Sequence, residues 1–341
     1  MAIYLEPEPF LEKSAFLKII DVRSPGEFEA GHIPDAVNIA LFDNEERAVV
    51  GTIYKQQGRE LAVLKALEIV GPKLVGYVTE AQKYVVNGEI LVHCWRGGMR
   101  SESFAWFCET IGLKVYLLKG GYKSYRHYIR QSFLLCDRLV VLGGFTGSGK
   151  TEILNELGKS GEQVIDLEGF ANHKGSAFGA IGQKEQPTTE QFENNLAQEW
   201  LKFDMRKPIF IEDESLKIGT VVINENLYSR MRSTKLYVVD IPRSERIKRI
   251  ERDYIIVPAE KLVSIVKRIE RRLGGDRCRE CCELFVSGDY KGAIDILLVY
   301  YDKGYSHGMS KRNQDMVHSV KLESGDPVKA AKALKDAVYN G

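Results

Sequence analysis

The sequence has few cysteines, almost no net charge and no long apolar run, and each shortage argues against a class of protein. Its 341 residues include six cysteines, too few and too scattered to indicate a disulfide framework. No apolar run approaches the roughly 18 residues that a membrane span requires. The first residues are acidic and lack the apolar core of a secretory signal, so we expect a cytoplasmic protein without membrane attachment. The net charge of +1 argues against a polyanion-binding surface over the whole molecule.

Internal repeats, low-complexity tracts and a linker rich in proline or glycine are also missing. At roughly 150 residues per domain, the length predicts two domains. Short apolar runs alternate with helical stretches in both halves, which predicts mostly parallel sheets covered by helices on both faces. We place the boundary within residues 128–136, giving domains at 1–132 and 133–341, and expect the chain from Ser244 on to be mainly helical. The runs that we predict as strands are 17–22, 89–93, 114–118, 138–142, 164–166, 208–211 and 236–240.

The most specific local feature is a cysteine loop between a predicted strand and a predicted helix. Residues 93–101 read His-Cys-Trp-Arg-Gly-Gly-Met-Arg-Ser. In this position Cys94 would face backbone N–H groups and the positive end of the helix dipole. Arg96 and Arg100 would add positive charge, and these effects together favour a nucleophilic thiolate. We therefore predict Cys94, Arg96 and Arg100 as catalytic residues, and interpret Cys108 and Cys136 as structural.

Segments around this loop resemble the rhodanese family. Residues 21–28 (Asp-Val-Arg-Ser-Pro-Gly-Glu-Phe) and 31–39 (Gly-His-Ile-Pro-Asp-Ala-Val-Asn-Ile) are similar to its two signatures, and residues 120–122 to its late segment. The resemblance implies a doubly wound α/β domain in which Cys94 carries sulfur or selenium as a persulfide or perselenide. Five residues separate Cys94 from Arg100, where the usual sulfurtransferase loop has four. The longer loop suits a larger anion and also fits Cys-dependent phosphatases, so both chemistries stay open at this point.

A second anion loop follows the predicted strand 138–142. Residues 144–151 fit G-x4-G-K-[ST] and open a predicted helix, the context in which this motif is credible. Its backbone N–H groups would hold phosphate groups, Lys150 would reach a terminal phosphate, and Thr151 would hold Mg²⁺. The pattern predicts a P-loop NTPase-like α/β domain whose phosphorylated ligand is left open. The binding residues would be Gly144, Gly147, Ser148, Gly149, Lys150 and Thr151.

Carboxylates after the later strands are candidates for holding the ion at this loop. Glu212 and Asp213 follow the predicted strand 208–211, and Asp166 follows 164–166. Residues 166–179 combine glycine, histidine, lysine and carboxylates without apolar periodicity, which is typical of a functional loop and adds His173 as a candidate. The run Cys278, Cys281 and Cys282 lacks a second pair of ligands nearby, so we predict no structural zinc site.

The combination of these features resembles one family, the bacterial tRNA 2-selenouridine synthases. The resemblance covers almost the full chain, including residues 212–215, 228–232, 273–275 and 300–305. It implies replacement of sulfur by selenium in 2-thiouridine at the wobble position of tRNA, with selenophosphate as the selenium donor. It also implies geranyl diphosphate as a co-substrate, through an S-geranylated uridine. On this reading Cys94 handles the selenium and the P-loop holds the prenyl diphosphate.

One basic segment predicts contact with tRNA phosphates. Residues 243–279 carry twelve Lys or Arg and six Asp or Glu, and spacings of three and four put several basic residues on one helix face. Such faces give salt-dependent affinity for RNA, although the acidic neighbours also allow an ordinary ion-paired surface. With two arginines from 228–232, the candidates are Arg230, Arg232, Arg243, Arg246, Arg249, Lys267, Arg268, Arg271 and Arg272.

Two other classes of function stay open from the residues alone. A Cys-dependent phosphatase of rhodanese fold, fused to a kinase-like P-loop domain, would release orthophosphate from an aryl phosphate. A non-enzymatic P-loop regulator would bind tRNA without changing its nucleosides. A cysteine held among anion-binding groups favours an enzyme over the regulator.

Overall fold

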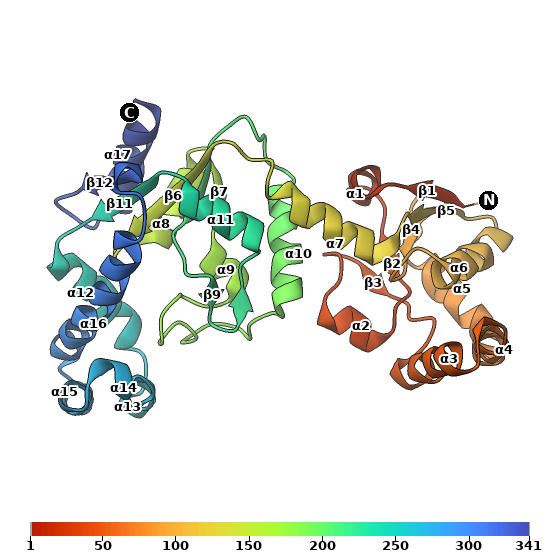
Figure 1. Ribbon diagram of the computed structural model, residues 1–341, viewed down its shortest axis with the longest axis horizontal. Coiled ribbons are helices and arrows are strands. Elements are labelled where there is room, and N and C mark those ends of the chain that lie inside the picture. Colours follow the sequence, from red (N-terminus) through yellow and green to blue (C-terminus); the bar gives the residue numbers. More distant parts are fainter. Residues whose placement is uncertain (1, 341) are drawn as a thin grey trace. The chain divides into compact units, whose positions relative to one another are not determined.

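The computed structural model describes residues 2–340 and divides the chain into two compact units (Figure 1). The first unit contains the residues up to Ser132 together with Glu193–Gln198, a six-residue part of helix α10 (Thr189–Trp200). The second unit contains Phe133–Phe192 and the residues from Glu199 on.

The first unit is built on a five-stranded sheet in the order β1-β5-β4-β2-β3, in which every strand pair is parallel. Its strands are β1 (Ile3–Leu5), β2 (Ile19–Asp21), β3 (Val37–Asn38), β4 (Glu89–His93) and β5 (Lys114–Leu118). Its helices are α1 (Pro7–Ser14), α2 (Pro25–Ala30), α3 (Asn44–Gln56), α4 (Arg59–Val70), the 3-10 turn η1 (Gly71–Lys73), α5 (Leu74–Gln82), α6 (Met99–Thr110) and α7 (Gly121–Ser132).

Local sequence explains why these elements begin where they do. The apolar runs of β4 and β5 are buried on both faces, as expected for central strands of a parallel sheet covered by helices. Helix α2 begins with Pro25 after a capping box of Ser24 and Glu27, which satisfies free backbone N–H groups. The core joins β2, β4 and β5 to the covering helices through side chains such as Ile90, Phe104 and Val115.

The second unit has a parallel sheet of its own, in the order β12-β11-β6-β8-β7, beside a two-stranded antiparallel ribbon, β9–β10. Its strands are β6 (Leu139–Gly144), β7 (Gln163–Ile165), β8 (Ile209–Glu212), β9 (Lys217–Ile218), β10 (Val221–Val222), β11 (Leu236–Asp240) and β12 (Val317–Lys321). Besides the two ends of α10, its helices are α8 (Lys150–Lys159), α9 (Leu167–Ala171), α11 (Glu225–Ser233), α12 (Arg243–Tyr254), α13 (Ala259–Arg268), α14 (Glu270–Leu273), α15 (Gly275–Ser287), α16 (Tyr290–Ser310), η2 (Gln314–Met316) and α17 (Pro327–Tyr339).

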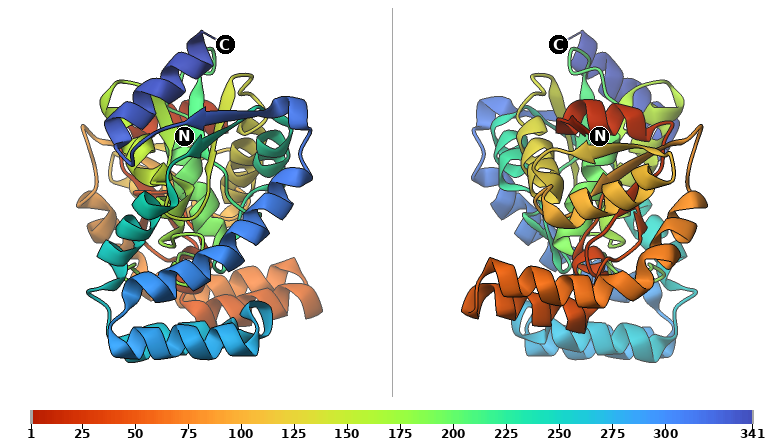
Figure 2. Two further views of the ribbon diagram at one scale, coloured as in Figure 1. Left: turned by 90° about the vertical axis from the view of Figure 1, so that its left-hand side faces the viewer. Right: turned by 90° about the vertical axis from the view of Figure 1, so that its right-hand side faces the viewer.

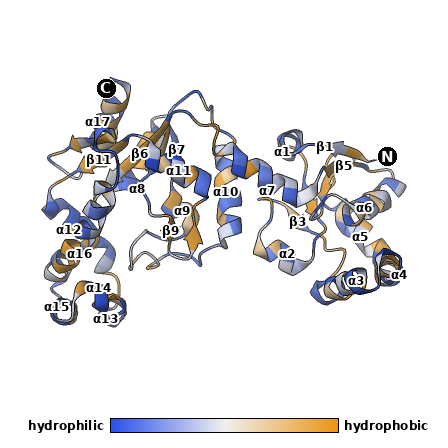
Figure 3. Ribbon diagram, viewed as in Figure 1, coloured by the Kyte–Doolittle hydropathy of each residue, from blue (hydrophilic) through white to orange (hydrophobic). Residues whose placement is uncertain are grey.

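Two hydrophobic clusters organise the second unit. One lies between the sheet and helices α8 and α17, and it includes Leu142, Leu154 and Leu334. The other joins the helices that follow β11, where α13, α15 and α16 pack on one another (Figure 2). Figure 3 shows the apolar strands inside each unit and the more hydrophilic outer turns of the helices. The second unit is therefore an α/β sheet domain extended by a helical layer.

The predicted fold class is confirmed, and the differences lie at the sheet edges. Strands 89–93, 114–118 and 236–240 have the predicted bounds. The edge strands β1 and β12 were not predicted, because both are partly exposed and pair with strands more than 70 residues away in the sequence. Strand β12 also interrupts the region from Ser244 on, which is otherwise helical as predicted. Among residues 2–340, no helix is long and apolar enough to cross a membrane.

Candidate functional site

Cys94 follows β4 directly and lies at the start of the loop that leads to α6. Its side chain is 3% exposed. The loop is held by the first turn of α7, where the backbone N–H groups of Tyr122 and Lys123 donate to the carbonyls of Cys94 and Trp95 at 2.8 and 3.0 Å. Gly121 makes this close approach possible, because it has a φ of 62° and a Cβ there would collide with the Cys94 carbonyl oxygen.

Ser101 is the polar side chain nearest to the sulfur of Cys94. Its hydroxyl oxygen lies 3.2 Å from Sγ and 3.0 Å from the carbonyl oxygen of Gly98. Sγ lies 3.8 Å from that same carbonyl oxygen. A thiol can therefore donate to Gly98, and a thiolate can accept from the hydroxyl of Ser101, which places a switchable hydrogen bond beside the nucleophile.

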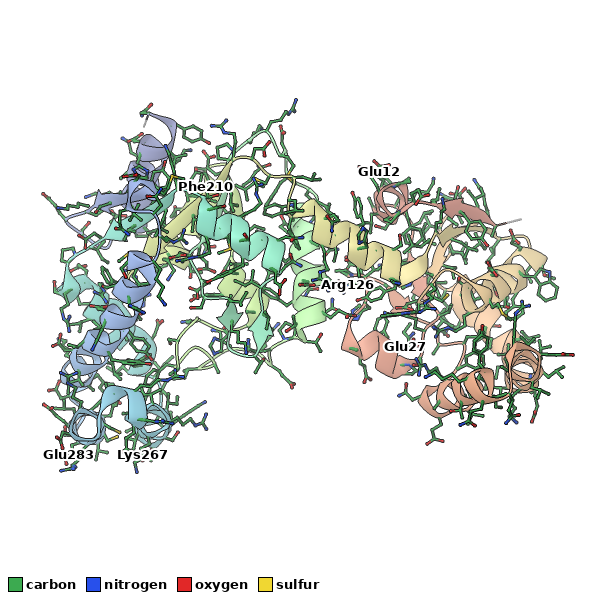
Figure 4. The ribbon with its side chains drawn as sticks, in the orientation of Figure 1. Glu12, Glu27, Arg126, Phe210, Lys267 and Glu283 are labelled. Carbon is green, nitrogen blue, oxygen red and sulfur yellow. The ribbon has the colours of Figure 1, made fainter. Side chains whose placement is uncertain are left out.

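The two predicted catalytic arginines have different surroundings. Arg96 is exposed. Arg100 donates to both carboxylate oxygens of Glu27 on α2, at 2.7 and 3.3 Å, and Figure 4 labels Glu27 there. Burial opposes the charge of Arg100, but Glu27 outweighs it and raises the pKa of the guanidinium. The partner of Arg100 in this structure is thus a carboxylate of the first rhodanese-like signature.

Two other residues of that signature, Asp21 and Arg23, form a buried ion pair near the cysteine loop. Arg23 and Asp21 are both fully buried and paired at 2.6 Å, and Arg23 also donates to the Gly31 carbonyl at 2.7 Å. The guanidinium lies 3.8 Å from the ring centroid of Tyr122. His93 lies 3.6 Å from Asp21, and burial lowers the pKa of its imidazole. These contacts tie the ends of β2 and β4 together below Cys94.

The P-loop connects β6 to α8, as its motif predicts. Gly149 ends the loop in a left-handed conformation with a φ of 85°, and Lys150 and Thr151 open the helix. The Lys150 ammonium lies 3.6 Å from Glu214. Burial opposes its charge, but the nearby carboxylates of Glu214 and Glu168 outweigh burial and raise the pKa of Lys150. The loop therefore holds a charged lysine at the position where a phosphate group would bind.

Three carboxylates converge beside this lysine: Glu168, Glu212 and Glu214, whose oxygen atoms lie within 4.8 Å of one another. Burial and the neighbouring carboxylates raise the pKa of Glu212 well above its ordinary range. Burial, only partly offset by Lys150, raises the pKa of Glu214 to about 7. The Thr151 hydroxyl lies 3.4 Å from Glu168. Crowded carboxylates of this kind are stabilised by added positive charge.

This donor set fits Mg²⁺. Carboxylate and hydroxyl oxygens are the ligands that this ion prefers. Glu212 is fully buried; its Oε1 accepts from the backbone N–H of Glu168 at 2.7 Å, whereas its Oε2 is buried without a hydrogen-bond partner. An oxygen that is buried and unpaired beside Thr151 and two further carboxylates is the observation that supports a cation here.

The other candidate acids are placed differently. Asp213 pairs with Arg312 at 2.5 Å and accepts from Tyr305 at 3.2 Å. Asp166 caps helix α9 by accepting from the N–H of Gly169 at 2.8 Å. His173 packs close to Gly179 and Gly219, and burial lowers the pKa of its imidazole. Of the four candidate residues, the structure brings only Glu212 into the carboxylate cluster.

Two arginines of α12, Arg246 and Arg249, donate hydrogen bonds to backbone carbonyls of the P-loop. Arg246 is 5% exposed, donates to the Thr146 carbonyl at 2.9 Å and pairs with Asp302 at 2.5 Å. Arg249 donates to the Gly147 carbonyl at 3.0 Å and pairs with Glu152. The basic residues predicted to contact tRNA therefore fall into two groups, and these two arginines have intramolecular partners instead.

The remaining tRNA candidates differ in whether their side chains already have a partner within the chain. Arg230 donates to the Cys136 carbonyl, Arg232 to the Gly308 carbonyl at 3.1 Å, and Arg243 to Asp295 at 2.7 Å. In contrast, the basic residues of α13 and α14 are exposed, and Figure 4 labels Lys267 on this helical layer. These exposed residues are Lys267, Arg268, Arg271 and Arg272.

A cavity of about 830 Å³ opens over the P-loop within the second unit. Its wall includes Lys150, Thr151, Glu168 and Glu214. Other parts of the wall come from the loop after α9 and from helices α11, α12 and α16. The cavity has room for a ligand much larger than the phosphate group that the loop itself would hold.

Comparison with known proteins identifies the family. Residues 8–128 match the rhodanese-like domain, and residues 137–333 match the tRNA 2-selenouridine synthase AAA domain. A tRNA 2-selenouridine synthase of Pseudomonas putida is 32% identical, covering 93% of this chain and 93% of its own length. One of Bdellovibrio bacteriovorus is 40% identical, covering 87% of this chain and 90% of its own. The chain belongs to the tRNA 2-selenouridine synthase family.

A solved structure is also similar to part of this tRNA 2-selenouridine synthase family member. The N-terminal domain of a putative ATP/GTP binding protein from Clostridium difficile 630 is 39% identical, covering 38% of this chain and 98% of that chain, with a TM-score of 0.34. The family assignment confirms the resemblance that the paired cysteine loop and P-loop indicated.

Sequence reasoning missed several residues that the structure places at the two loops. Ser101 lies in the cysteine loop and Glu27 in the first rhodanese-like segment, but neither side chain was predicted to take part in the site. Glu168 and Glu214 lie within two residues of selected acids, and only the folded chain shows which carboxylates converge. Tyr305 accepts from the N–H of Gly144 at 2.9 Å, 161 residues away in the sequence, and no local signal predicts such a contact.

Proposed function

We propose that this chain replaces sulfur by selenium in the wobble 2-thiouridine of tRNA, with selenophosphate as the selenium donor and through an S-geranylated uridine. The observation that carries the proposal is the presence of a buried nucleophile loop and a cavity-forming P-loop in one chain of this family. Neither loop by itself distinguishes this activity from phosphatase or nucleotide chemistry.

Cys94 is the residue proposed to release selenium from selenophosphate. Its sulfur is paired with a hydroxyl that can donate to a thiolate, and its loop presents backbone N–H groups at the start of α6. The backbone N–H groups would hold the phosphate portion of selenophosphate while the thiolate of Cys94 attacks its phosphorus. The phosphorus–selenium bond then breaks, selenide leaves for the tRNA, and water hydrolyses the S-phosphocysteine to orthophosphate. Arg100 would assist this binding by exchanging its contact with Glu27 for the incoming anion.

The P-loop is the proposed site of geranyl diphosphate. Its N–H groups and Lys150 would hold the diphosphate, and the carboxylate cluster with Thr151 would hold Mg²⁺, which neutralises charge on the leaving group. A bond then forms between the C2 sulfur of the uridine and the first carbon of the geranyl group, while the carbon–oxygen bond to diphosphate breaks. Alkylation makes the sulfur a leaving group, so that selenium can form a bond to C2 as the geranyl thiol departs.

The exposed basic residues of α13 and α14 are the proposed tRNA contacts. Lys267, Arg268, Arg271 and Arg272 are exposed, and no salt bridge is found for them among residues 2–340. A basic helical face whose charges are not paired within the chain suits the phosphate backbone of RNA. This assignment narrows the wider set of basic residues considered from the sequence.

The test is to incubate the purified protein with 2-thiouridine tRNA, geranyl diphosphate and selenophosphate, and then to measure the masses of the nucleosides. We expect a selenium-containing uridine from the wild type. Cys94→Ser should stop at the geranylated uridine, and Lys150→Ala should leave 2-thiouridine unchanged. Loss of geranylation in a folded Cys94→Ser variant would contradict this division between the two loops.

The same assay separates the competing functions. Unchanged 2-thiouridine, together with Cys94-dependent release of orthophosphate from an aryl phosphate, would favour the phosphatase. Binding of tRNA without any change in its nucleosides or any phosphatase activity would favour the regulator. Circular dichroism of each variant shows whether a lost activity reflects a lost fold.

A further inference from the structure

The cavity over the P-loop has a second region that phosphate binding does not use. Lys150 and Thr151 line the cavity at the P-loop, and its remaining lining combines charged and polar residues with a group of aromatic and aliphatic side chains. We call this second region the aromatic wall; it consists of Phe178, Ile181, Tyr254, Tyr300 and Tyr301. All five belong to or pack against the hydrophobic cluster of the helical layer.

Helix α16 connects the aromatic wall to the P-loop. Tyr305 donates to Asp213 and accepts from the N–H of Gly144, which fixes this point of α16 against the start of the P-loop. Tyr301 lies four residues earlier, about 6 Å along the helix axis, on the same face. The aromatic wall therefore begins roughly one helical turn from the phosphate cradle.

Gly304 lies between these two points and leaves open space in the cavity. It lines the cavity, and a Cβ built on it would meet no atom within 4 Å. The absence of a side chain therefore does not serve a close helix contact. A larger side chain at this position would have open space around it at the cavity lining.

The chemistry of the aromatic wall suits a hydrocarbon. The rings of Phe178 and Tyr254 lie 5.0 Å apart, and those of Tyr300 and Tyr301 lie 5.1 Å apart, so two ring pairs contribute to this part of the lining. Two charged residues of the same lining, Lys174 and Asp253, pair with each other at 2.9 Å. Such a surface gains free energy by covering apolar groups and offers little charge to a polar one.

We propose, resting on the function proposed above, that the aromatic wall binds the hydrocarbon chain of a diphosphate ester, and that the gap at Gly304 provides the space for its first carbons. The P-loop then holds the diphosphate while the chain runs along α16 toward Tyr300 and Tyr301. The arrangement selects a ligand with an apolar tail over free diphosphate and over a nucleotide.

The test compares the affinities of the full-length protein for geranyl diphosphate, inorganic diphosphate and ATP by calorimetry in the presence of Mg²⁺. We expect the wild type to bind geranyl diphosphate at least tenfold more tightly than inorganic diphosphate. Gly304→Leu should remove this advantage while changing the affinity for inorganic diphosphate less than twofold. Leucine favours a helix more than glycine does, so the variant should stay folded.

Ser306→Leu is the matched control, because Ser306 is an exposed residue of the same helix outside the cavity lining. This variant should bind all three ligands like the wild type. A Gly304→Leu protein that keeps the preference for geranyl diphosphate would overturn the proposal, as would a wild type that prefers ATP or binds the two diphosphates equally. A preference that is lost in Gly304→Leu, without geranyl transfer to tRNA, would support the aromatic wall and contradict the proposed reaction.

Discussion

At the residue scale, the contact between Ser101 and Cys94 yields a prediction about the reactivity of the sulfur. A hydrogen bond to a charged acceptor contributes roughly 1.5–3 kcal/mol, and Ser101 is positioned to supply one to the thiolate at 3.2 Å. We expect Ser101→Ala to slow alkylation of Cys94 by iodoacetamide at neutral pH by roughly tenfold or more. The measurement is the rate of modification of Cys94, followed by peptide mass spectrometry.

Ser132→Ala is the control for this prediction. Ser132 is also a buried hydroxyl of the first unit, but it donates to the Ile129 carbonyl at 2.7 Å within α7. Its removal should leave the alkylation rate of Cys94 unchanged. Equal rates in wild type and Ser101→Ala would show that the hydroxyl does not act on the thiolate.

Also at the residue scale, Glu214 makes the stability of the protein depend on pH. Its folded pKa of about 7 lies above its ordinary value of 4.5, so the folded state holds a proton that the unfolded state has lost between these values. The stabilisation is present below pH 4.5 and is lost as the pH rises through 7. We expect Glu214→Gln to gain stability over the wild type from pH 5 to pH 8, by on the order of 2–3 kcal/mol.

Urea unfolding without divalent cations, at several pH values, measures this difference. Glu199→Gln is the matched control, because Glu199 pairs with Lys202 on the surface at 2.8 Å. The free energy of unfolding of Glu199→Gln should differ from that of the wild type by a nearly constant amount at every pH. A pH-independent difference for Glu214→Gln would mean that Glu214 is ionised throughout this range.

At the scale of elements, α12 and α14 carry similar charges but are used differently. The arginines of α12 donate to the P-loop and its neighbours, whereas Arg271 and Arg272 of α14 are exposed. We expect the double variant Arg271→Ala/Arg272→Ala to bind tRNA more weakly at low salt. Its plot of log affinity against log salt concentration should be shallower by up to about 1.8, because each lost phosphate contact removes roughly 0.7–0.9 from the slope.

Filter binding over a series of salt concentrations measures both effects. Lys321→Ala, which removes an exposed charge from the edge strand β12, is the control and should bind like the wild type. Unchanged thermal unfolding of the double variant would show that the arginines do not support the fold. A parallel salt dependence in the wild type and the double variant would place the tRNA contacts elsewhere.

At the scale of the whole molecule, the two loops lie in different units and should complement one another between chains. Cys94→Ser retains the P-loop, and Lys150→Ala retains the cysteine loop. We expect a mixture of the two variants to form selenouridine, since one chain supplies geranylated tRNA and the other completes the exchange. Nucleoside mass spectrometry of the mixture and of each variant alone measures this outcome.

A mixture that accumulates only geranylated tRNA would show that the intermediate does not pass between chains. Wild-type protein at the same total concentration is the positive control. A mixture that forms neither product would contradict the assignment of geranylation to the P-loop of the Cys94→Ser chain.

Much of the architecture was predictable because central parallel strands have a strong local signature. The runs at β4, β5 and β11 are apolar on both faces, and the two anion loops carry glycines at required positions. The edge strands β1 and β12 could not be predicted in this way, because partial exposure weakens their apolar pattern. The roles of Arg246 and Arg249 also escaped prediction, because charge spacing on a helix does not show which face the P-loop covers.

The sequence by itself determined the two α/β units, the positions of Cys94 and Lys150, and the family to which the chain belongs. These features depend on residues that are close together in the chain, so local spacing was enough. The tertiary structure alone decided which carboxylates converge on Lys150, which arginines remain exposed, and that α16 joins an aromatic wall to the P-loop. These features bring together residues from separate helices and strands, and their contacts follow from the packing of whole elements rather than from any local pattern.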